Sequence, residues 1–301
     1  MRILITGATG FIGQALVKEC HRRGIAVNYL TTSKEKIITS PEYQGFYWNT
    51  KEGEIDSTCF YNVEAIIHLA GATVAKRWKS SYKEEIIESR ILSANLLFTA
   101  LQKSEHDIKH FISASGISIY PSHLEKLYTE EDALYNERFL NKVSASWETA
   151  ADKFALLGLK VTKLRTGIVL GKASGAFPKL TKIVNSGFGS ALGTGKQWQS
   201  WIHEQDLAAM YLYVLQNELE GVFNAVAPQP VTQKEMMLAI MRKNHKKRWL
   251  PNTPSFVLKL ALGEMATILL ESQKVSSAKI EKKGFEFQFP KLEDALHELK
   301  R

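Results

Sequence analysis

Three glycines near the N-terminus have the spacing that most clearly indicates chemistry. They lie in the stretch Gly7-Ala8-Thr9-Gly10-Phe11-Ile12-Gly13, directly after a short apolar run. Glycines allow a tight turn, let the backbone approach a pyrophosphate, and let the next helix pack closely against the strand. The helix N-terminus then offers free N–H groups and a positive dipole to phosphate oxygens. This strand–turn–helix context predicts a dinucleotide site, with contacts from Gly7, Thr9, Gly10, Phe11, Ile12 and Gly13.

The end of the second predicted strand indicates which dinucleotide fits. An NAD site usually has an acid there, about 20 residues after the glycines, to bind the ribose 2′-hydroxyl. Here the segment reads Tyr29-Leu30-Thr31-Thr32-Ser33-Lys34, and the first acid is Glu35. Hydroxyls and an ammonium group are better suited to a 2′-phosphate, although Lys34 alone would also be explained by exposure to solvent. We therefore predict NADP(H), bound at this end by Thr31, Thr32, Ser33 and Lys34.

Alternating strands and helices must position these residues. Apolar runs bounded by turn residues predict strands, and apolar residues at helical spacing predict helices. The predicted strands are 3–5, 25–31, 65–71, 110–116 and 160–170, and the predicted helices are 11–23, 81–104 and 144–158. This βαβα series predicts an α/β fold with a doubly wound parallel Rossmann sheet and helices on both faces.

The pattern changes after Gly171. The following stretch is rich in glycine and aromatic residues, with a helix-like segment at 178–185, and residues 228–301 are mostly helical in pattern. We predict an NADP-binding Rossmann core over residues 1–171. Residues 172–301 are predicted to form a smaller, mostly helical C-terminal substrate lobe, from which 206–227 returns to the core.

The bulk composition is that of an ordinary globular protein. The 301 residues are 45% hydrophobic and 23% charged, which argues against a disordered or fibrous chain. Cys20 and Cys59 are far apart, which suits a reducing compartment and gives no reason to propose a metal site. No apolar stretch approaches the roughly 18 residues of a membrane span, and no signal peptide is expected before the first strand. We expect a cytoplasmic protein that does not bind membranes.

The net charge of +8 raises the question of an anionic partner. Lysines and arginines are scattered, apart from a local cluster at residues 242–249. We interpret that cluster as a solvated loop after a helix and predict no nucleic-acid binding.

The motifs "TGATGFIG", "HLAGA" and "LRTGIVLG" resemble the extended short-chain dehydrogenase/reductase superfamily, which includes sugar-nucleotide epimerases. The stretches "AKRWKSSYKEEIIESR", "GTGKQWQSWIHEQDLA", "GEMATILLESQKV" and "GFEFQFP" are similar to atypical epimerase-family oxidoreductases with a distinctive C-terminal domain. The resemblance covers nearly the whole chain. It implies that Leu69, Ala70 and Gly71 contact the nucleotide.

The superfamily's usual catalytic set is a Ser or Thr with a Tyr-x-x-x-Lys pair. The tyrosine exchanges a proton with the substrate oxygen, while the lysine lowers the tyrosine pKa and binds the nicotinamide ribose. The resemblance assigns the hydroxyl to Ser115, with Ser113 and Ser118 as rivals. The pair's place holds Phe139/Val143 or Leu140/Ser144, with Lys142 one residue off, so the usual pair is missing.

Other residues are candidates because of their positions. Thr166 and Gly167 end a predicted strand, where the ligand crevice of such sheets forms. On the predicted helix 81–104, Arg90 could reach a phosphate or ribose and Glu85 a ribose hydroxyl, although a surface ion pair explains them equally well.

The best substrate-side candidates are Gln197, Trp198, Ser200, Trp201 and His203. Aromatic and polar groups in a glycine-framed loop could form a pocket for a planar or sugar-like ligand. His203 could replace the missing acid, but the resemblance implies that a histidine before a helix here is structural.

These observations favour an NADP(H)-dependent oxidoreductase acting on an unknown carbonyl or sugar-like substrate. A non-catalytic NADP(H)-binding sensor is the alternative, supported by the missing pair. The sequence leaves open whether the chain forms a homodimer through residues 89–101 and 144–157.

Overall fold

The computed structural model describes residues 1–132, 136–246 and 250–300, and these residues contain a nine-stranded sheet. Its strands follow the order β13-β9-β7-β6-β1-β2-β4-β3, and β5 pairs with β4. They are β1 (Arg2–Thr6), β2 (Ala26–Thr31), β3 (Thr39–Ser40), β4 (Tyr43–Asn49), β5 (Glu54–Ile55), β6 (Ala65–His68), β7 (His110–Gly116), β9 (Lys160–Thr166) and β13 (Gly221–Ala225). Neighbours from β13 to β4 are parallel, while β3 and β5 are antiparallel to β4.

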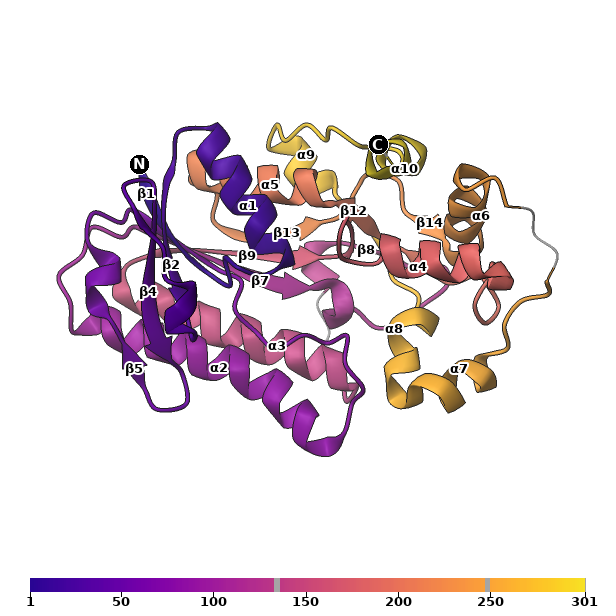
Figure 1. Ribbon diagram of the computed structural model, residues 1–301, viewed down its shortest axis with the longest axis horizontal. Helices are drawn as coiled ribbons and strands as arrows, with labels where there is room; N and C mark the ends of the chain where they lie inside the picture. Colours follow the sequence, from indigo (N-terminus) through magenta and orange to yellow (C-terminus); the bar gives the residue numbers. More distant parts are fainter. Residues whose placement is uncertain (133–135, 247–249, 301) are drawn as a thin grey trace.

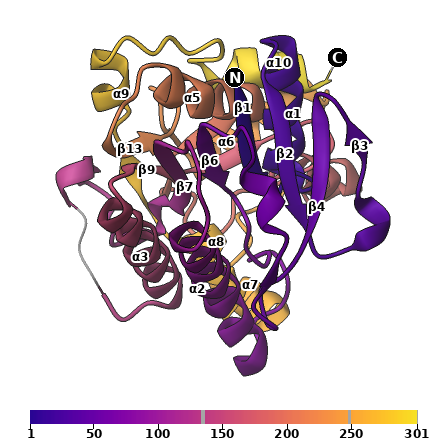
Figure 2. The same cartoon turned by 90° about the vertical axis from the view of Figure 1, so that its left-hand side faces the viewer.

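Helices cover both faces of this sheet. α1 (Phe11–Arg22) and α5 (Glu204–Gln216) lie on one face, and α2 (Ser80–Gln102) and α3 (Phe139–Asp152) lie side by side on the other (Figures 1 and 2). Within β1, Ile3 and Ile5 belong to the core beneath α1 and α5, whereas Leu4 belongs to the core beneath α2 and α3. Alternate side chains of a strand point to opposite faces, so both faces are apolar. The predicted doubly wound Rossmann-like sheet is confirmed.

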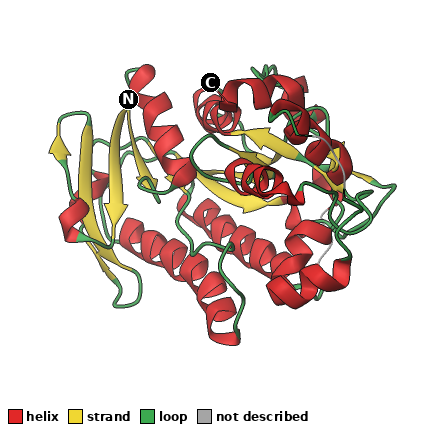
Figure 3. Ribbon diagram, turned by 45° about the vertical axis from the view of Figure 1, so that its right-hand side comes forward, coloured by secondary structure: helices red, strands yellow, loops and turns green. Residues whose placement is uncertain are grey.

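The C-terminal half adds helices beyond one end of the sheet (Figure 3). α4 (Phe177–Ile183), α6 (Gln233–Lys243) and α10 (Leu292–Lys300) share one apolar core, and α7 (Ser255–Leu262) belongs to a smaller one. The remaining helices are α8 (Thr267–Leu270) and α9 (Ala278–Lys282), and the paired short strands are β8 (Leu127–Tyr128) with β15 (Lys274–Val275), β10 (Ile168–Leu170) with β12 (Trp201–His203), and β11 (Trp198–Gln199) with β14 (Val231–Thr232). Single turns of helix are η1 (Lys34–Lys36), η2 (Ser57–Phe60), η3 (Ile117–Ile119), η4 (Glu130–Asp132), η5 (Lys153–Leu157), η6 (Val184–Phe188) and η7 (Gly263–Ala266).

The predicted strand 160–170 is in fact two strands. Its break lies at Gly167, where an added Cβ would stand 2.3 Å from the Ser200 carbonyl oxygen. The Ile168 N–H donates to that same oxygen at 2.8 Å, and β10 leaves the main sheet to pair with β12. Close approach of two main chains therefore turns the strand away from the sheet.

Two further differences concern α3 and β4. Helix α3 begins at Phe139, five residues before the predicted start, and ends at Asp152 before the turn η5. Strand β4 was not predicted, although it extends the parallel sheet beside β2.

The division of the chain at Gly171 stays a prediction. The structure places β13 beside β9 in the main sheet. Within the described ranges, no helix is both long and apolar enough to cross a membrane.

Candidate dinucleotide and substrate site

The glycine turn joins β1 to α1 in a shape that side chains would prevent. Gly7 has φ +72°, and its carbonyl accepts a 2.9 Å hydrogen bond from the Gly10 N–H. An added Cβ on Gly13 would lie 2.1 Å from the Gly7 oxygen, and one on Gly7 would lie 3.1 Å from the Leu69 carbonyl carbon. Gly10 is the residue before α1 and has no side chain to cap the helix. The free N–H groups of the first helical turn can therefore take phosphate oxygens, so this cradle fits a pyrophosphate.

A buried hydroxyl fixes the second wall of this cradle. The Thr6 Oγ1 accepts hydrogen bonds from the Leu69 and Ala70 N–H groups, both at 3.1 Å. It also lies 2.8 Å from Nδ1 of His68, which is fully buried. Burial and the nearby charge of Arg90 lower the pKa of His68 to about 3, so its ring is neutral at physiological pH. Residues 69–71 are thereby held against the glycine turn.

The end of β2 has hydroxyl and ammonium groups. Thr31 is buried, and its Oγ1 accepts a 3.2 Å hydrogen bond from the Ser33 N–H, which shapes the turn. Thr32 and Lys34 are exposed, and the Lys34 Nζ lies 4.8 Å from the centre of the Tyr47 ring on β4. Residues 31–34 include no carboxylate that would oppose a 2′-phosphate.

Arg90 lies in α2 directly beneath the 69–72 loop and is 7% exposed. Its Nη1 donates to the Ala72 carbonyl at 3.1 Å and to the Ile86 carbonyl at 2.7 Å. Its guanidinium lies 4.5 Å from the centre of the Trp147 ring. An added Cβ on Gly71 would lie 2.9 Å from the Arg90 Cζ. Burial lowers the pKa of Arg90 to about 10, which still leaves it charged at neutral pH.

The structure does not pair Arg90 with Glu85. Among the described residues, Arg90 forms no ion pair, and Glu85 is exposed on the outer side of α2. Within the same residues, Nε of Arg90 and Nε1 of Trp147 have no hydrogen-bond partner.

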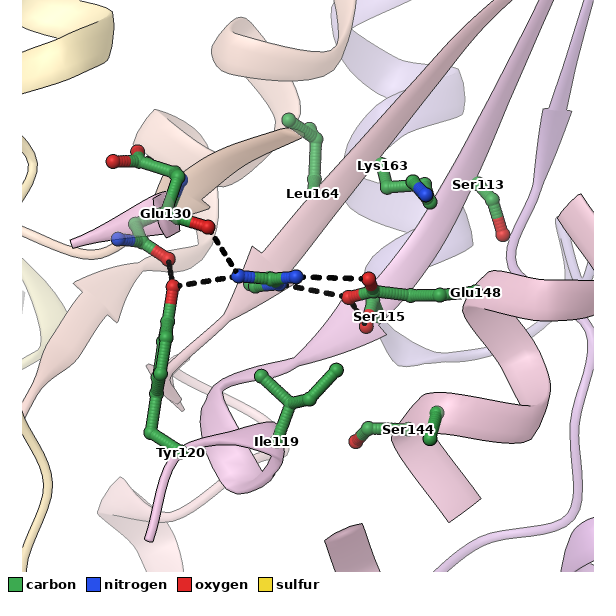
Figure 4. A network of polar contacts seen from close by, with 12 residues as sticks. Ser113, Ser115, Ile119, Tyr120, Glu130, Ser144, Glu148, Lys163 and Leu164 are labelled. Atoms are coloured by element: carbon green, nitrogen blue, oxygen red, sulfur yellow. Dashed lines mark hydrogen bonds and ion pairs between the residues drawn. The ribbon is translucent and has the colours of Figure 1, made fainter. Parts of the chain in front are cut away.

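Ser115 points from β7 into a buried network (Figure 4). Its Oγ donates to Oε1 of Glu148 at 2.7 Å. Arg165 donates to both carboxylate oxygens of Glu148, through Nε at 2.8 Å and Nη2 at 2.9 Å. Nη1 of Arg165 also donates to the Tyr120 hydroxyl at 3.0 Å, and that hydroxyl donates to Asn224. The Ser115 hydroxyl is therefore engaged with an internal ion pair.

The pairing with Glu148 also acts on the pKa of Arg165. Burial would lower the pKa of the guanidinium, but the hydrogen bonds and the charge of Glu148 outweigh burial and raise it. Burial raises the pKa of Tyr120 to about 12, so its hydroxyl keeps its proton.

Ser144, one of the two alternatives for the lysine position, lies beside Ser118 of η3. Oγ of Ser118, in η3, lies 2.8 Å from Oγ of Ser144 on α3 and donates to the Leu140 carbonyl at 3.2 Å. An added Cβ on Gly116 would lie 3.3 Å from each hydroxyl. Lys142 instead forms an ion pair with Glu137.

Two other candidate positions are apolar. Val143 is buried, and the Phe139 ring lies 4.9 Å from Trp78. Ser113 is also buried, and its Oγ donates to the Ala114 carbonyl. Tyr135, which precedes this helix in sequence, lies outside the described residues. Ser113 and Ser115 are thus engaged within the fold, and Ser118 is engaged through Ser144 and the Leu140 carbonyl.

Gln197 lines a hollow of about 530 Å³. The other lining residues are Ser122, His123, Leu124, Glu125, Thr194, Leu270 and Ser272. Nε2 of Gln197 donates to the Leu192 and Leu269 carbonyls, which positions the loop around the hollow. Trp198 lies next to it, with Nε1 donating to the Leu124 carbonyl at 2.8 Å. Hydroxyl, amide and imidazole groups suit a polar, sugar-like ligand.

Trp201 and His203 are fully buried. Nε1 of Trp201 donates to the Gln229 carbonyl, and Nδ1 of His203 accepts from the Gln205 N–H at the start of α5. Burial lowers the pKa of His203 to about 4, so the ring is neutral. This placement favours a structural role for both residues. The other two candidates near this strand also make internal contacts. The Gly167 main chain packs against the Ser200 carbonyl, and the Thr166 Oγ1 donates to the Leu164 carbonyl at 3.3 Å.

Two ion pairs join the Rossmann part to the segment after α7. Lys83, near the start of α2, pairs with Glu264 in η7. Arg138, directly before α3, pairs with Glu271 after α8 at 3.2 Å. The two pairs thus link the N-terminal ends of α2 and α3, at the carboxyl edge of the sheet, to the segment 264–271.

Sequence reasoning missed Trp147 and Glu148. Glu148 follows Ser144 by four residues, so helical spacing places both on one side of α3, facing β7 and η3. A carboxylate on the buried side of a predicted helix was the signal that could have revealed the ion pair with Arg165.

Comparison with known proteins agrees with this geometry. Over 300 residues, the chain is 34% identical to epimerase family protein YfhF of Bacillus subtilis (strain 168), covering 99% of this chain and 98% of the relative. It is 35% identical over 301 residues to epimerase family protein SERP0438 of Staphylococcus epidermidis, with the same coverage. A crystal structure of human epimerase family protein SDR39U1 (isoform 2) with NADPH matches with a TM-score of 0.86 and 28% identity, covering 99% of each chain.

Two family models divide most of the sequence between them. Residues 253–299 match a domain of unknown function (DUF1731), which includes α7 and α10. Residues 3–225, from β1 to β13, match the NAD dependent epimerase/dehydratase family. The chain belongs to the NAD dependent epimerase/dehydratase family.

Proposed function

We propose that this protein is an NADP(H)-dependent oxidoreductase of the extended short-chain dehydrogenase type, acting on a carbonyl or sugar-like substrate. The observation that carries the cofactor choice is the end of β2. Lys34 and Thr32 are exposed there, and residues 31–34 contain no carboxylate. The human relative SDR39U1, whose structure was determined with NADPH, supports the same choice.

The chain's own residues divide the work along the edge of the sheet. The cradle at Gly7, Gly10 and Gly13 binds the pyrophosphate at the α1 N-terminus, and Lys34 binds the 2′-phosphate. A nicotinamide bound in this crevice would supply or accept the hydride. Ser118 is less buried than Ser113 and Ser115 and is linked to Ser144; its hydroxyl would donate to the substrate oxygen in place of the Leu140 carbonyl. In reduction the substrate oxygen would take its proton from water, and in oxidation it would release that proton to water, because a serine hydroxyl is a poor acid.

Calorimetric titration with NADPH, NADP, NADH and NAD tests this proposal. We expect micromolar NADPH binding that is weakened about tenfold or more by Lys34→Glu, because the variant puts a carboxylate beside the phosphate. Lys36→Glu is the matched control, since Lys36 is exposed in the same η1 turn. Equal binding of NADH and NADPH would overturn the choice of cofactor, and no binding of any dinucleotide would overturn the whole proposal.

A second candidate is an NADP(H) sensor without turnover. The observation in its favour is that the tyrosine and lysine positions hold Phe139 and Val143 or Leu140 and Ser144, and neither alignment restores the pair. A panel of carbonyl substrates, read at 340 nm with NADPH, distinguishes the two functions. For an enzyme, Ser118→Ala should slow turnover while NADPH affinity stays within about twofold of the native value. Tight NADPH binding with no oxidation by any panel member favours the sensor.

A further inference from the structure

We propose that Arg90 holds the nicotinamide half of the cofactor and provides the positive charge that the family's lysine would otherwise supply. This inference rests on the proposed function. Its first support is that Arg90 is a buried cation without a counter-ion. Among the described residues, its partners are two carbonyls and the Trp147 ring, and none is a carboxylate.

A buried, unpaired charge is costly, so folded proteins normally pair it or neutralise it. The guanidinium of Arg90 does not neutralise at physiological pH. Carbonyl dipoles and an aromatic face compensate it only in part. An electron-rich ligand at this place would complete the compensation. Within the described residues the Arg90 Nε is buried and has no hydrogen-bond partner, which adds to the cost that such a ligand would offset.

The topology assigns Arg90 to one half of the dinucleotide. A dinucleotide lies across the carboxyl edge of the sheet at the point where the strand order reverses. Here β1 lies between β2 and β6, and the 2′-phosphate end is at β2. The other half then extends toward β6 and β7. Arg90 contacts the loop after β6 and a side chain of α3, the helix that packs on β7.

Trp147 connects Arg90 to the position of the missing lysine. Trp147 follows Ser144 by three residues on α3, which is one helical turn. A guanidinium over the Trp147 face is therefore within one turn of the Ser118–Ser144 hydroxyl pair. In this proposal the charge comes from the neighbouring helix α2, through contact with Trp147, and not from a lysine on α3.

The guanidinium is also held in one orientation. Nη1 donates to the Ala72 and Ile86 carbonyls, and Gly71 leaves room for the group where a Cβ would stand 2.9 Å from Cζ. Pre-oriented donors bind with less loss of conformational freedom than flexible ones. A planar guanidinium in a fixed place suits the neighbouring hydroxyls of a ribose better than a mobile ammonium.

Truncated ligands separate the two halves of the site. The probes are NADPH, which has both halves, and 2′,5′-ADP, which has only the adenosine half. We expect Arg90→Met to weaken NADPH binding by about tenfold to a hundredfold, the usual effect of losing a hydrogen bond to a charged group, with 2′,5′-ADP affinity changed less than about twofold. Lys34→Glu should weaken both ligands. Lys153→Met is the matched control, because Lys153 is an exposed cation that joins η5, directly after α3, to α2 through Asn95.

Two further variants separate the charge of Arg90 from its planar geometry and from any effect on folding. Arg90→Lys keeps the charge but loses the planar stack, so it should recover part of the NADPH affinity. If Arg90→Met does not fold, Gly71→Ala displaces the guanidinium and should still weaken NADPH selectively. Trp147→Phe should reduce the energy transfer from tryptophan to bound NADPH.

The outcomes separate this inference from the proposed function. Equal loss of NADPH and 2′,5′-ADP affinity, or no loss of either, in the Arg90→Met variant overturns the inference while native NADPH binding still supports the proposed function. Absence of NADPH binding in the native protein overturns both. A selective loss that Arg90→Lys partly restores supports the inference.

Discussion

Two buried arginines on the same side of the sheet differ in how their charges are compensated. Arg165, on β9, is 3% exposed and donates two hydrogen bonds to the Glu148 carboxylate. Arg90, on α2, is 7% exposed and has no carboxylate among the described residues. Arg165 binds elements of the fold to one another, since Glu148 is on α3 and also accepts from Ser115 on β7.

This difference in charge compensation suggests different roles for the two arginines, structural for Arg165 and ligand-binding for Arg90. The Arg165 network is complete without any ligand, so its loss should affect stability first. The Arg90 charge is incomplete without a ligand, so its loss should affect binding first. Low exposure alone would not have distinguished the two residues.

The largest expected effect is the loss of stability when the Arg165–Glu148 ion pair is broken. Arg165→Met leaves the buried Glu148 charge unpaired, and we expect it to lower the free energy of unfolding by about 3–5 kcal/mol. Urea denaturation measures this loss. The control is the double variant Arg165→Met/Glu148→Leu, which removes both charges and should recover much of the stability. A single variant as stable as the native protein would contradict the comparison.

Buried histidines avoid a charge by staying neutral, which gives a pH test. The pKa of His203 is about 4 in the folded protein, below the ordinary value of 6.5, so protons bind the unfolded chain more readily between these pH values. Stability is therefore complete above pH 6.5 and falls as pH decreases toward 4. His203 should contribute a loss of about 2 kcal/mol at pH 5 relative to pH 7.

The matched variant is His203→Asn, which does not titrate but can still cap α5. Urea unfolding of both proteins from pH 4 to 7 should show a shallower fall for the variant. Taking the difference between the two curves removes the pH dependence that other titrating groups contribute to both proteins. One such group is Asp206, whose pKa burial raises to about 6. Parallel curves would show that His203 gains no proton on unfolding.

Removing the Arg90 guanidinium, which has no carboxylate partner among the described residues, should have a smaller effect on stability. We expect Arg90→Met to change the free energy of unfolding by less than about 1 kcal/mol, because relief of the buried charge offsets the lost carbonyl hydrogen bonds. Urea denaturation without cofactor is the measurement. A loss as large as that of Arg165→Met would mean that the two arginines serve the same structural purpose.

The smallest effect is expected for Gly71→Ala. Its Cβ would come within 2.9 Å of the Arg90 Cζ, so the guanidinium must move by a fraction of an ångström. We expect a loss of roughly 0.5–1 kcal/mol in NADPH binding, a few-fold in Kd. In the Arg90→Met background the same change should have no further effect, since the two residues act on one contact. Additive losses in the double variant would separate Gly71 from Arg90.

The cofactor end of the site could be predicted from sequence because its signals are local. Gly7, Gly10 and Gly13 are close in the chain, and their need for small size is seen in one turn and one helix. The doubly wound sheet followed from alternating strands and helices in the same way.

The rest of the candidate site could not be predicted, because its residues are far apart in sequence and meet only through strand pairing and helix packing. Ser115 and Arg165 are cross-strand neighbours of β7 and β9, and both meet Glu148 only after α3 packs on the sheet. The predicted helix began at Ser144, which hid the N-terminal turn that brings Leu140 to Ser118. Strand β4 was missed because its apolar residues do not alternate regularly and Gly45 interrupts them, a glycine that leaves space for the Tyr29 ring.

The ion pairs Lys83–Glu264 and Arg138–Glu271 also impose an order in time. Each joins an early segment of the chain to one that a ribosome adds well over a hundred residues later. Strands β1 to β9 are all translated before Glu264, and domains generally form as their own residues emerge. A nascent chain would therefore complete its glycine cradle while the bridging acids are still being synthesised, and cofactor present during translation would meet that cradle before either bridge exists.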